Sequence, residues 1–153
     1  MESPEPQSSN YDLLASFVED NGSAAQPEVD DQLRRLVKLS GHRWGRIVIL
    51  TAACPDPINQ GRHYARRLLS VGGGLVEVLH IDSRLQANDE HAVGLVAQAT
   101  CIVMPGNQRA RLATLLDGTE LLQTIRRRQS EGCVVAATRP GASLLGLRAD
   151  IVL

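Results

Sequence analysis

A chain of 153 residues fits one domain, and because 43% of its residues are hydrophobic and only 3% aromatic, its core must be aliphatic. No run reaches the ~18 apolar residues that a membrane span needs and no signal peptide is recognised, so we expect a cytoplasmic protein without a membrane span. The net charge of −1 conceals an asymmetry: residues 1–31 carry eight acids and no base, whereas residues 32–153 carry sixteen bases and nine acids. The bases are scattered over several predicted helices, which favours a solvated surface over nucleic-acid binding.

The first 31 residues read as a leader that precedes an α/β domain of residues 32–153. Residues 1–10 are rich in Pro, Ser and Glu, a composition typical of disorder. Residues 11–20 predict a short amphipathic helix with one apolar face, formed by Leu13, Leu14, Phe17 and Val18. Such a helix docks on its own domain or on a partner, and these four side chains are the candidate docking residues.

From residue 29 onwards, apolar runs alternate with helical patterns. The runs at 46–53, 75–81, 101–104 and 133–137 predict buried strands, and the helical patterns lie at 30–41, 57–73, 88–99 and, with a break at Asp117-Gly118, between 107 and 132. A further helix begins near 142–145. Unbroken apolar strands separated by helices indicate a mostly parallel sheet covered on both faces, which is a three-layer α/β sandwich.

Parallel sheets of this kind place their sites at the carboxyl ends of the strands. Here these ends are residues 51–54, 80–82, 104–108 and 137–141. His80 is the one histidine at this edge, and a lone histidine there is more often structural than catalytic.

Metal and cofactor chemistry find no support in the sequence. Cys54, Cys101 and Cys133 are odd in number and far apart, which favours buried thiols over disulfides or metal ligands. The glycine run at 71–75 follows a helix and precedes a strand, the reverse of a phosphate loop. We therefore expect no metal and no cofactor.

The segment from Pro105 to Ala142 carries a family resemblance. Pro105-Gly106-Asn107-Gln108, the turn at 116–119, the helix Ile125-Arg126-Arg127-Arg128 and the strand and turn at 132–142 follow one another in an order that resembles the cyanophycinase family of serine peptidases. These are relatives of the bacterial aspartyl dipeptidases, and the resemblance covers about residues 33–148. It implies a flavodoxin-like, class I glutamine amidotransferase-like fold.

The chain departs from that family at the two positions where the chemistry resides. The resemblance places Arg139 at the nucleophilic serine of a strand-to-helix elbow and Pro140 at the backbone N–H that stabilises the oxyanion. A guanidinium cannot attack a carbonyl and proline has no N–H, so Thr138, Arg139, Pro140 and Gly141 read as a vestigial elbow with no catalytic residue. We expect Pro140 to push Arg139 out of helical backbone angles. Neither Thr138 nor Ser143 reads as a replacement nucleophile.

The family's base and its orienting acid come from segments after the elbow, and the sequence ends at Leu153, so we expect this chain to lack them. The favoured hypothesis is a catalytically inactive cyanophycinase-like domain that serves as a binding, scaffold or assembly subunit, as a homo-oligomer or within a larger complex. Its possible ligand-binding residues are Gly106, Asn107, Gln108 and Arg139, which could hold a carboxylate or phosphate. One alternative is a serine-type hydrolase whose site is completed by another chain, and a second is a binder of anionic ligands or nucleic acid.

Overall fold

The computed structural model describes residues 27–146 and 149–153. The predicted helix at 11–20, with Leu13, Leu14, Phe17 and Val18, lies outside the described residues.

The centre of the molecule is a five-stranded sheet in the order β2-β1-β3-β4-β5, in which every neighbouring pair is parallel. The strands are β1 (Arg46–Leu50), β2 (Leu75–Leu79), β3 (Cys101–Met104), β4 (Val134–Ala137) and β5 (Ile151–Val152). The chain runs outward from β1 to β2, returns to β3 on the other side of β1, and continues outward to β5. This is the flavodoxin-like order, which confirms the expected fold class.

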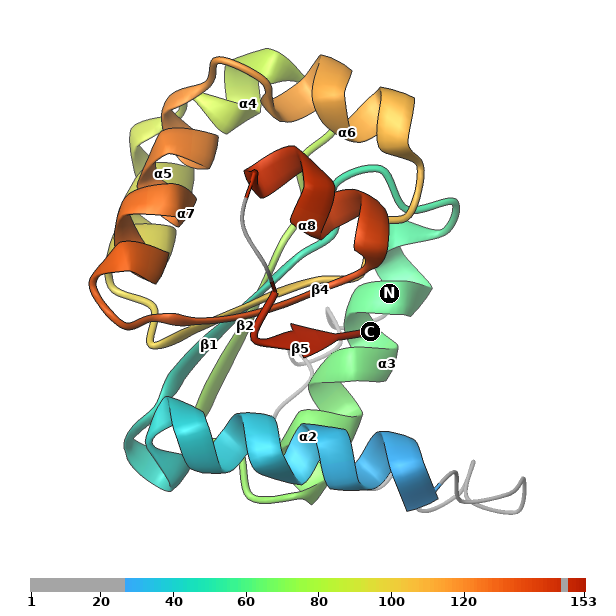
Figure 1. The fold of residues 1–153 in the computed structure, drawn as a ribbon, viewed down its shortest axis with the longest axis vertical. Helices are drawn as coiled ribbons and strands as arrows, with labels where there is room; N and C mark the ends of the chain where they lie inside the picture. The colour runs from blue at the N-terminus through green and yellow to red at the C-terminus, as the bar shows by residue number, and fades with distance from the viewer. Residues whose placement is uncertain (1–26, 147–148) are drawn as a thin grey trace, which may run out of the picture.

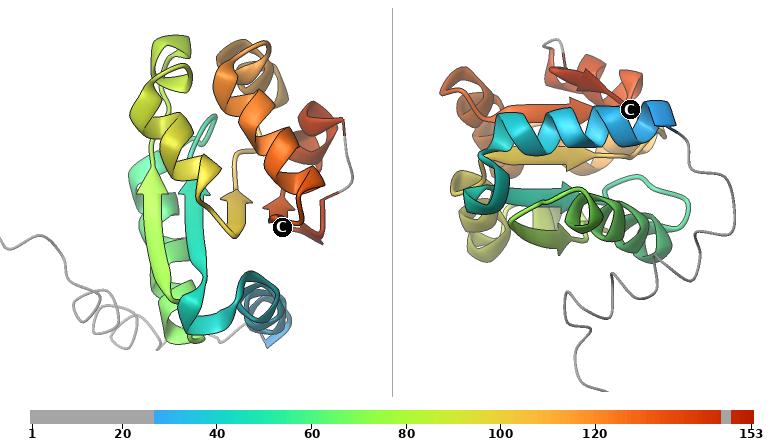
Figure 2. Two further views of the ribbon diagram at one scale, coloured as in Figure 1. Left: turned by 90° about the vertical axis from the view of Figure 1, so that its left-hand side faces the viewer. Right: turned by 90° about the horizontal axis from the view of Figure 1, so that it is seen from below.

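Helices cover both faces of the sheet, as Figures 1 and 2 show. The helices are α2 (Pro27–Ser40), the 3₁₀ helix η1 (His42–Trp44), α3 (Pro57–Ser70), α4 (Arg84–Ala87), α5 (Glu90–Ala97), α6 (Arg109–Leu116), α7 (Glu120–Ser130) and α8 (Arg139–Leu145). α2 and α3 pack on one face and α4 to α8 on the other, as right-handed crossovers from this strand order require. In Figure 1, α4 and α6 lie at the end of the sheet opposite α2.

The two faces of the sheet carry alternating side chains of the same strands. On β1, Val48 and Leu50 pack under the larger helical layer, whereas Ile47 and Ile49 pack under α2 and α3. All four side chains are buried. The continuous apolar runs seen in the sequence are therefore strands buried on both faces.

Helix α2 begins earlier than the sequence pattern suggests. It starts at Pro27, so residues 27–31 are helical rather than part of a disordered leader. Asp30 forms an ion pair of 2.5 Å with Arg67 of α3, with both side chains largely buried, and this pair ties α2 to α3. The expected boundary at residue 31 thus falls within a helix.

Two other differences concern strand ends. The predicted strand at 46–53 ends at Leu50, because the chain turns at Ala52 and Ala53. β5 was not expected from the sequence, and it is held at the edge by Asp150, whose carboxylate accepts a hydrogen bond from the backbone N–H of Val135 (2.8 Å). No helix within the described ranges is both long and apolar enough to cross a bilayer.

Candidate functional site

The carboxyl edge of the sheet has a topological switch point between β1 and β3, where successive connections leave in opposite directions. Folds of this kind bind ligands in the crevice at that point. The loops that flank it are residues 51–56 after β1 and Pro105 to Gln108 after β3.

These two loops are packed backbone against backbone. A Cβ added to Gly106 would lie 2.0 Å from the carbonyl oxygen of Ala52, so only glycine fits there. Ala53 has a φ of 57°, a left-handed conformation that costs an alanine about 1 kcal/mol or more. The two loops are therefore in direct main-chain contact at the switch point, and Asn107 and Gln108, which follow Gly106, are exposed.

The turn from β4 to α8 contains the four residues of the predicted vestigial elbow. Thr138 is the N-cap of α8, with extended backbone (φ −66°, ψ 165°), and its hydroxyl accepts a hydrogen bond from the N–H of Gly141 (3.3 Å). The same hydroxyl donates to the carbonyl oxygen of Gly106 at 2.6 Å. Thr138 thus joins the β4 turn to the β3 loop. Its hydroxyl proton forms a hydrogen bond to the backbone carbonyl oxygen of Gly106.

The backbone of this turn differs from the expectation. Arg139 is the first residue of α8, so Pro140 does not push it out of the helix; the extended conformation falls on Thr138 instead. Among the described non-glycine residues only His42 and Ala53 have positive φ, so Arg139 lacks the strained backbone of a nucleophile elbow. The strand–turn–helix layout is present, but the strain at this edge lies at Ala53.

A groove between α6 and α8 lies beside this turn and was not identified from the sequence. Its cavity of about 220 Å³ is lined by Arg109, Ala113, Asp117, Ser143 and Leu144. Arg139 precedes Ser143 by four residues, so both lie on the same side of α8. Two features of the sequence could have indicated this groove: the four-residue spacing of Arg139 and Ser143, and the position of Arg109 directly after Gln108.

Two guanidinium groups at this edge are exposed and have no partner among the described residues. Neither Arg109 nor Arg139 forms an ion pair or hydrogen bond within the described chain, whereas Arg126 and Arg128 of α7 are engaged by backbone carbonyls. Exposed guanidinium groups bind carboxylate or phosphate through paired N–H donors. Of the predicted ligand-binding residues, Gly106 is buried, whereas Asn107, Gln108 and Arg139 are solvent-accessible.

His80 is remote from this turn. Its Nδ1 lies 2.6 Å from the hydroxyl of Thr51, a buried residue at the end of β1. β2 and β4 are separated by β1 and β3, so His80 lies three strand spacings from the β4 turn, roughly 14 Å. His80 therefore cannot act as a base for a group at residues 138–143.

The cysteines form no reactive or metal-binding group. All three are free and buried, and burial raises the pKa of Cys54 and of Cys133 to about 11. Burial also raises the pKa of Cys101 well above its usual value, with contributions from Cys133 and Asp150. In the described part of the chain, no three His, Cys, Asp or Glu side chains come together in a way that could hold a metal ion.

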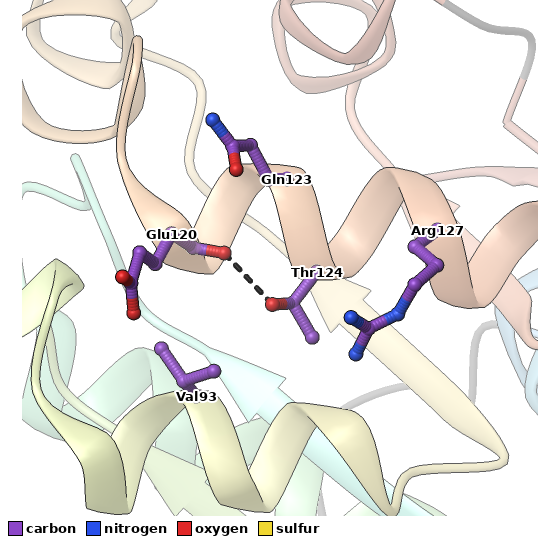
Figure 3. A pocket seen from close by; sticks show the side chains of 5 residues that line it. All are labelled: Val93, Glu120, Gln123, Thr124 and Arg127. Carbon is purple, nitrogen blue, oxygen red and sulfur yellow. Dashed lines mark hydrogen bonds between the residues drawn. The ribbon is translucent and has the colours of Figure 1, made fainter.

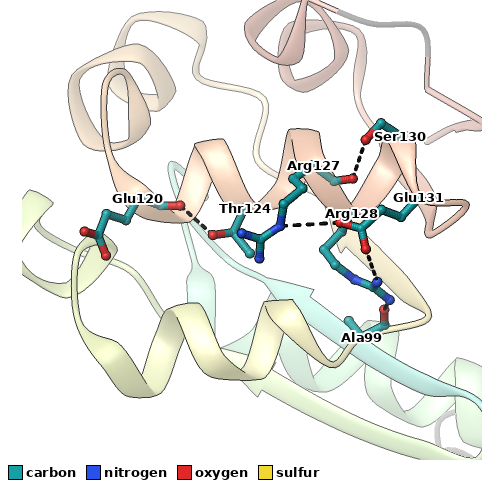
Figure 4. Close-up of polar contacts among 7 residues, drawn as sticks. All are labelled: Ala99, Glu120, Thr124, Arg127, Arg128, Ser130 and Glu131. Carbon is teal, nitrogen blue, oxygen red and sulfur yellow. Dashed lines mark hydrogen bonds and ion pairs between the residues drawn. The ribbon is translucent and has the colours of Figure 1, made fainter.

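A second hollow lies between α5 and α7 (Figure 3). Its cavity of about 440 Å³ is lined by Val93, Glu120, Gln123, Thr124 and Arg127. Figure 4 shows that two of its polar side chains have partners nearby on the chain: Thr124 donates to the carbonyl oxygen of Glu120 (2.8 Å), and Arg127 pairs with Glu131, the residue that follows α7 (3.4 Å). The hollow contains no nucleophile with an adjacent base.

The fold and the edge loops define a three-layer α/β protein of flavodoxin-like strand order. Comparison with proteins of known sequence and structure identifies its relatives. No family model matches the chain. The cyanophycinase of Synechococcus elongatus is 32% identical over 101 residues, which are 65% of this chain and 31% of that protein. The cyanophycinase of Geminocystis herdmanii is 30% identical over 135 residues, or 88% of this chain and 50% of that protein.

One solved structure resembles this chain in fold. The crystal structure of a peptidase from an acI-B1 Actinobacterium matches with a TM-score of 0.54 and 24% identity, over 71% of this chain and 46% of that one. The chain thus belongs to the cyanophycinase-like peptidase family. It spans half or less of the length of these relatives.

Proposed function

We propose that this chain is a non-hydrolytic, cyanophycinase-like binding domain that holds an anionic group at the edge between α6 and α8. The observation that carries the proposal is the β4–α8 turn, where a solvent-exposed arginine occupies the position that the family resemblance assigns to the nucleophile. We also propose a cytoplasmic location, supported by three free, buried cysteines.

The neighbouring hydroxyls do not replace a nucleophile. A hydroxyl nucleophile needs a base within hydrogen-bond reach. The Thr138 hydroxyl instead donates to the carbonyl oxygen of Gly106 and caps α8. Ser143 shares the α6–α8 groove with the carboxylate of Asp117, but no hydrogen bond joins the two side chains in the described part of the chain, and His80 lies three strands away from the turn.

Binding is supported by the charges that remain. Arg109 and Arg139 present two guanidinium groups without a partner among the described residues, close in sequence or space to the exposed Asn107 and Gln108. Asp117 also lines the groove, so a ligand bearing a carboxylate together with a cationic group suits its charges better than a simple polyanion.

The first test is hydrolysis. We expect no cleavage of β-aspartyl-arginine polymer or of Asp-containing dipeptides by the purified chain, under conditions in which a cyanophycinase cleaves its substrate. Cleavage that disappears in Thr138→Ala or Ser143→Ala would instead establish the serine-type hydrolase alternative.

The second test is binding. Titration calorimetry with aspartate, an aspartyl-arginine dipeptide and inorganic phosphate should show binding that Arg139→Ala weakens about tenfold, the loss expected for one charge-assisted contact. Arg62→Ala is the matched control, because Arg62 is an exposed arginine on α3, which covers the other face of the sheet. Equal affinities of the two variants would refute the anion site.

A further inference from the structure

The amino end of the sheet carries a surface that the proposed function does not use. Six large apolar side chains are exposed among the described residues, and three of them belong to one corner: Leu39 at the end of α2, Trp44 in η1 and Leu75 at the start of β2. We call these three the apolar corner. The other three, Ile58, Leu85 and Val152, belong to separate elements.

The corner is built by close backbone contacts between its three elements. The N–H of Leu75 donates to the carbonyl oxygen of Gly45 (3.0 Å), and a Cβ added to Gly74 would lie 2.4 Å from the carbonyl oxygen of Arg43. On the other side, a Cβ on Gly45 would lie 2.6 Å from the carbonyl oxygen of Ser40. The end of α2, η1 and the start of β2 therefore form one continuous surface.

The surface is also basic. Segments 38–46 and 71–76 contain Lys38, His42, Arg43 and Arg46 and no acidic residue. The guanidinium of Arg43 lies over the ring of Trp44, 5.0 Å from its centroid. Trp44 itself is 79% exposed, an unusual state for so large an apolar side chain.

We propose that residues 11–20 of the same chain dock on the apolar corner. The segment has the complementary composition: Leu13, Leu14, Phe17 and Val18 recur at helical spacing, and Asp12, Glu19 and Asp20 flank them without any base. In the docked segment, the four apolar side chains pack against Leu39, Trp44 and Leu75. Its three acidic side chains lie near Lys38, Arg43 and the other bases of the corner.

The length of the connecting chain permits this docking. α2 has 14 residues and therefore runs about 21 Å from Pro27 to Ser40, where the corner begins. The seven steps from Asp20 to Pro27 span up to about 24 Å when extended. The segment can therefore lie back along α2 and reach the corner with the connecting chain nearly extended.

Trp44 is the only tryptophan of the chain and reports directly on this docking. We compare the full chain with a chain lacking residues 1–26 by tryptophan emission and acrylamide quenching. Docking predicts a blue-shifted emission and about a twofold lower quenching constant in the full chain, because the indole leaves water. Identical spectra and quenching in the two chains would overturn the proposal.

Two leader variants separate specific docking from a general effect of the extra residues. Phe17→Asp places a charge on the apolar face and should restore the quenching of the truncated chain, whereas Ser16→Asp places the same charge off that face and should leave the protection intact. Equal effects of the two variants would contradict the proposal. Protection that is lost on dilution, with a mass in light scattering above the 16.6 kDa of one chain, would show that a second copy occupies the corner instead.

Discussion

Arg126 of α7 holds the end of α8 through Leu145: its Nε donates to the carbonyl oxygen of that residue at 3.1 Å, and its Nη2 donates to the carbonyl oxygen of Leu144 at 2.9 Å. α8 has only seven residues, so its last carbonyls have no partner within the helix. The guanidinium of Arg126 supplies those partners and fixes the helix that carries Arg139 and Ser143.

Removing this guanidinium should destabilise the protein. We expect Arg126→Ala to lower the free energy of unfolding by about 1–2 kcal/mol, since two charge-assisted hydrogen bonds are lost from a partly exposed site. Urea denaturation measures the change, and hydrogen exchange should show faster exchange confined to α8. The matched control is Arg127→Ala, which removes an exposed ion pair with Glu131 and should cost less than about 0.5 kcal/mol. Equal losses in the two variants would show that Arg126 does not anchor α8.

The contact between the β1 and β3 loops makes a second prediction. Gly106→Ala places a methyl group 2.0 Å from the carbonyl oxygen of Ala52, and because both partners are backbone, neither can move cheaply. We expect a loss of about 2–3 kcal/mol in the free energy of unfolding. Gly94→Ala is the control, since a Cβ there meets nothing within 4 Å inside α5, and it should stabilise the protein by about 0.5–1 kcal/mol. A neutral Gly106→Ala would mean that the two loops are not packed in solution.

The hydrogen bonds of the Thr138 hydroxyl lead to a third prediction. Thr138→Val keeps the shape but removes the bond to Gly106 and the cap of α8, so it should cost about 1–2 kcal/mol of unfolding free energy. Thr138→Ser keeps the hydroxyl and should recover most of that loss. Thr114→Val removes an exposed hydroxyl bonded to Ala110 within α6 and should change the unfolding free energy by no more than about 0.5 kcal/mol. If urea denaturation gave equally small losses of unfolding free energy for Thr138→Val and Thr114→Val, the hydrogen bond between Thr138 and Gly106 would not stabilise the fold.

Local signals in the sequence account for the elements that were predicted correctly. The break between α6 and α7 follows from Gly118, whose φ is 71°, and from Thr119, whose hydroxyl accepts a hydrogen bond from the N–H of Leu122 at 3.3 Å. The continuous apolar run at 101–104 is β3, a strand buried on both faces. Such features depend only on neighbouring residues, so the sequence is sufficient to identify them.

The missed elements depend on contacts that no local pattern encodes. α4 has four residues, too few to show periodicity, and it is positioned by Arg84, which donates to the carbonyl oxygen of Thr114 at 3.0 Å. β5 has two residues that pair with Ala136 and Ala137 of β4. Both elements form because an already folded neighbour offers a partner.

Some features of the candidate site were likewise predictable from the sequence, and others were not. The strand order places the loops at 51–54, 104–108 and 137–141 along one edge, and this follows from the α/β alternation. The α6–α8 groove and the bond between Thr138 and Gly106 depend on how distant segments pack, so the sequence did not predict them. The expected non-helical Arg139 was wrong because Thr138, the better N-cap residue, takes the extended conformation.

The buried thiols predict how stability depends on alkaline pH. Burial holds the pKa of Cys54 and of Cys133 at about 11 in the folded chain, against about 9 for an ordinary thiol. Between pH 9 and pH 11 the unfolded chain therefore releases protons that the folded chain retains, so the free energy of unfolding must fall as pH rises through this range. Below about pH 8 these two groups are almost fully protonated in both states and contribute almost no pH dependence.

Urea denaturation under reducing conditions from pH 8 to pH 10.5 measures this fall. Other groups also titrate in the alkaline range, so the decisive quantity is the difference in slope between the parent chain and the double variant Cys54→Ala with Cys133→Ala. We expect a shallower decline in the double variant, and native thiols that react slowly with a disulfide reagent at pH 8 but rapidly in urea, because the reactive species is the thiolate. Parallel slopes, or rapid labelling of the folded chain, would show that these thiols are accessible to water; rapid labelling of Cys54 in particular would mean that the loop after β1 is more open than its contact with Gly106 indicates.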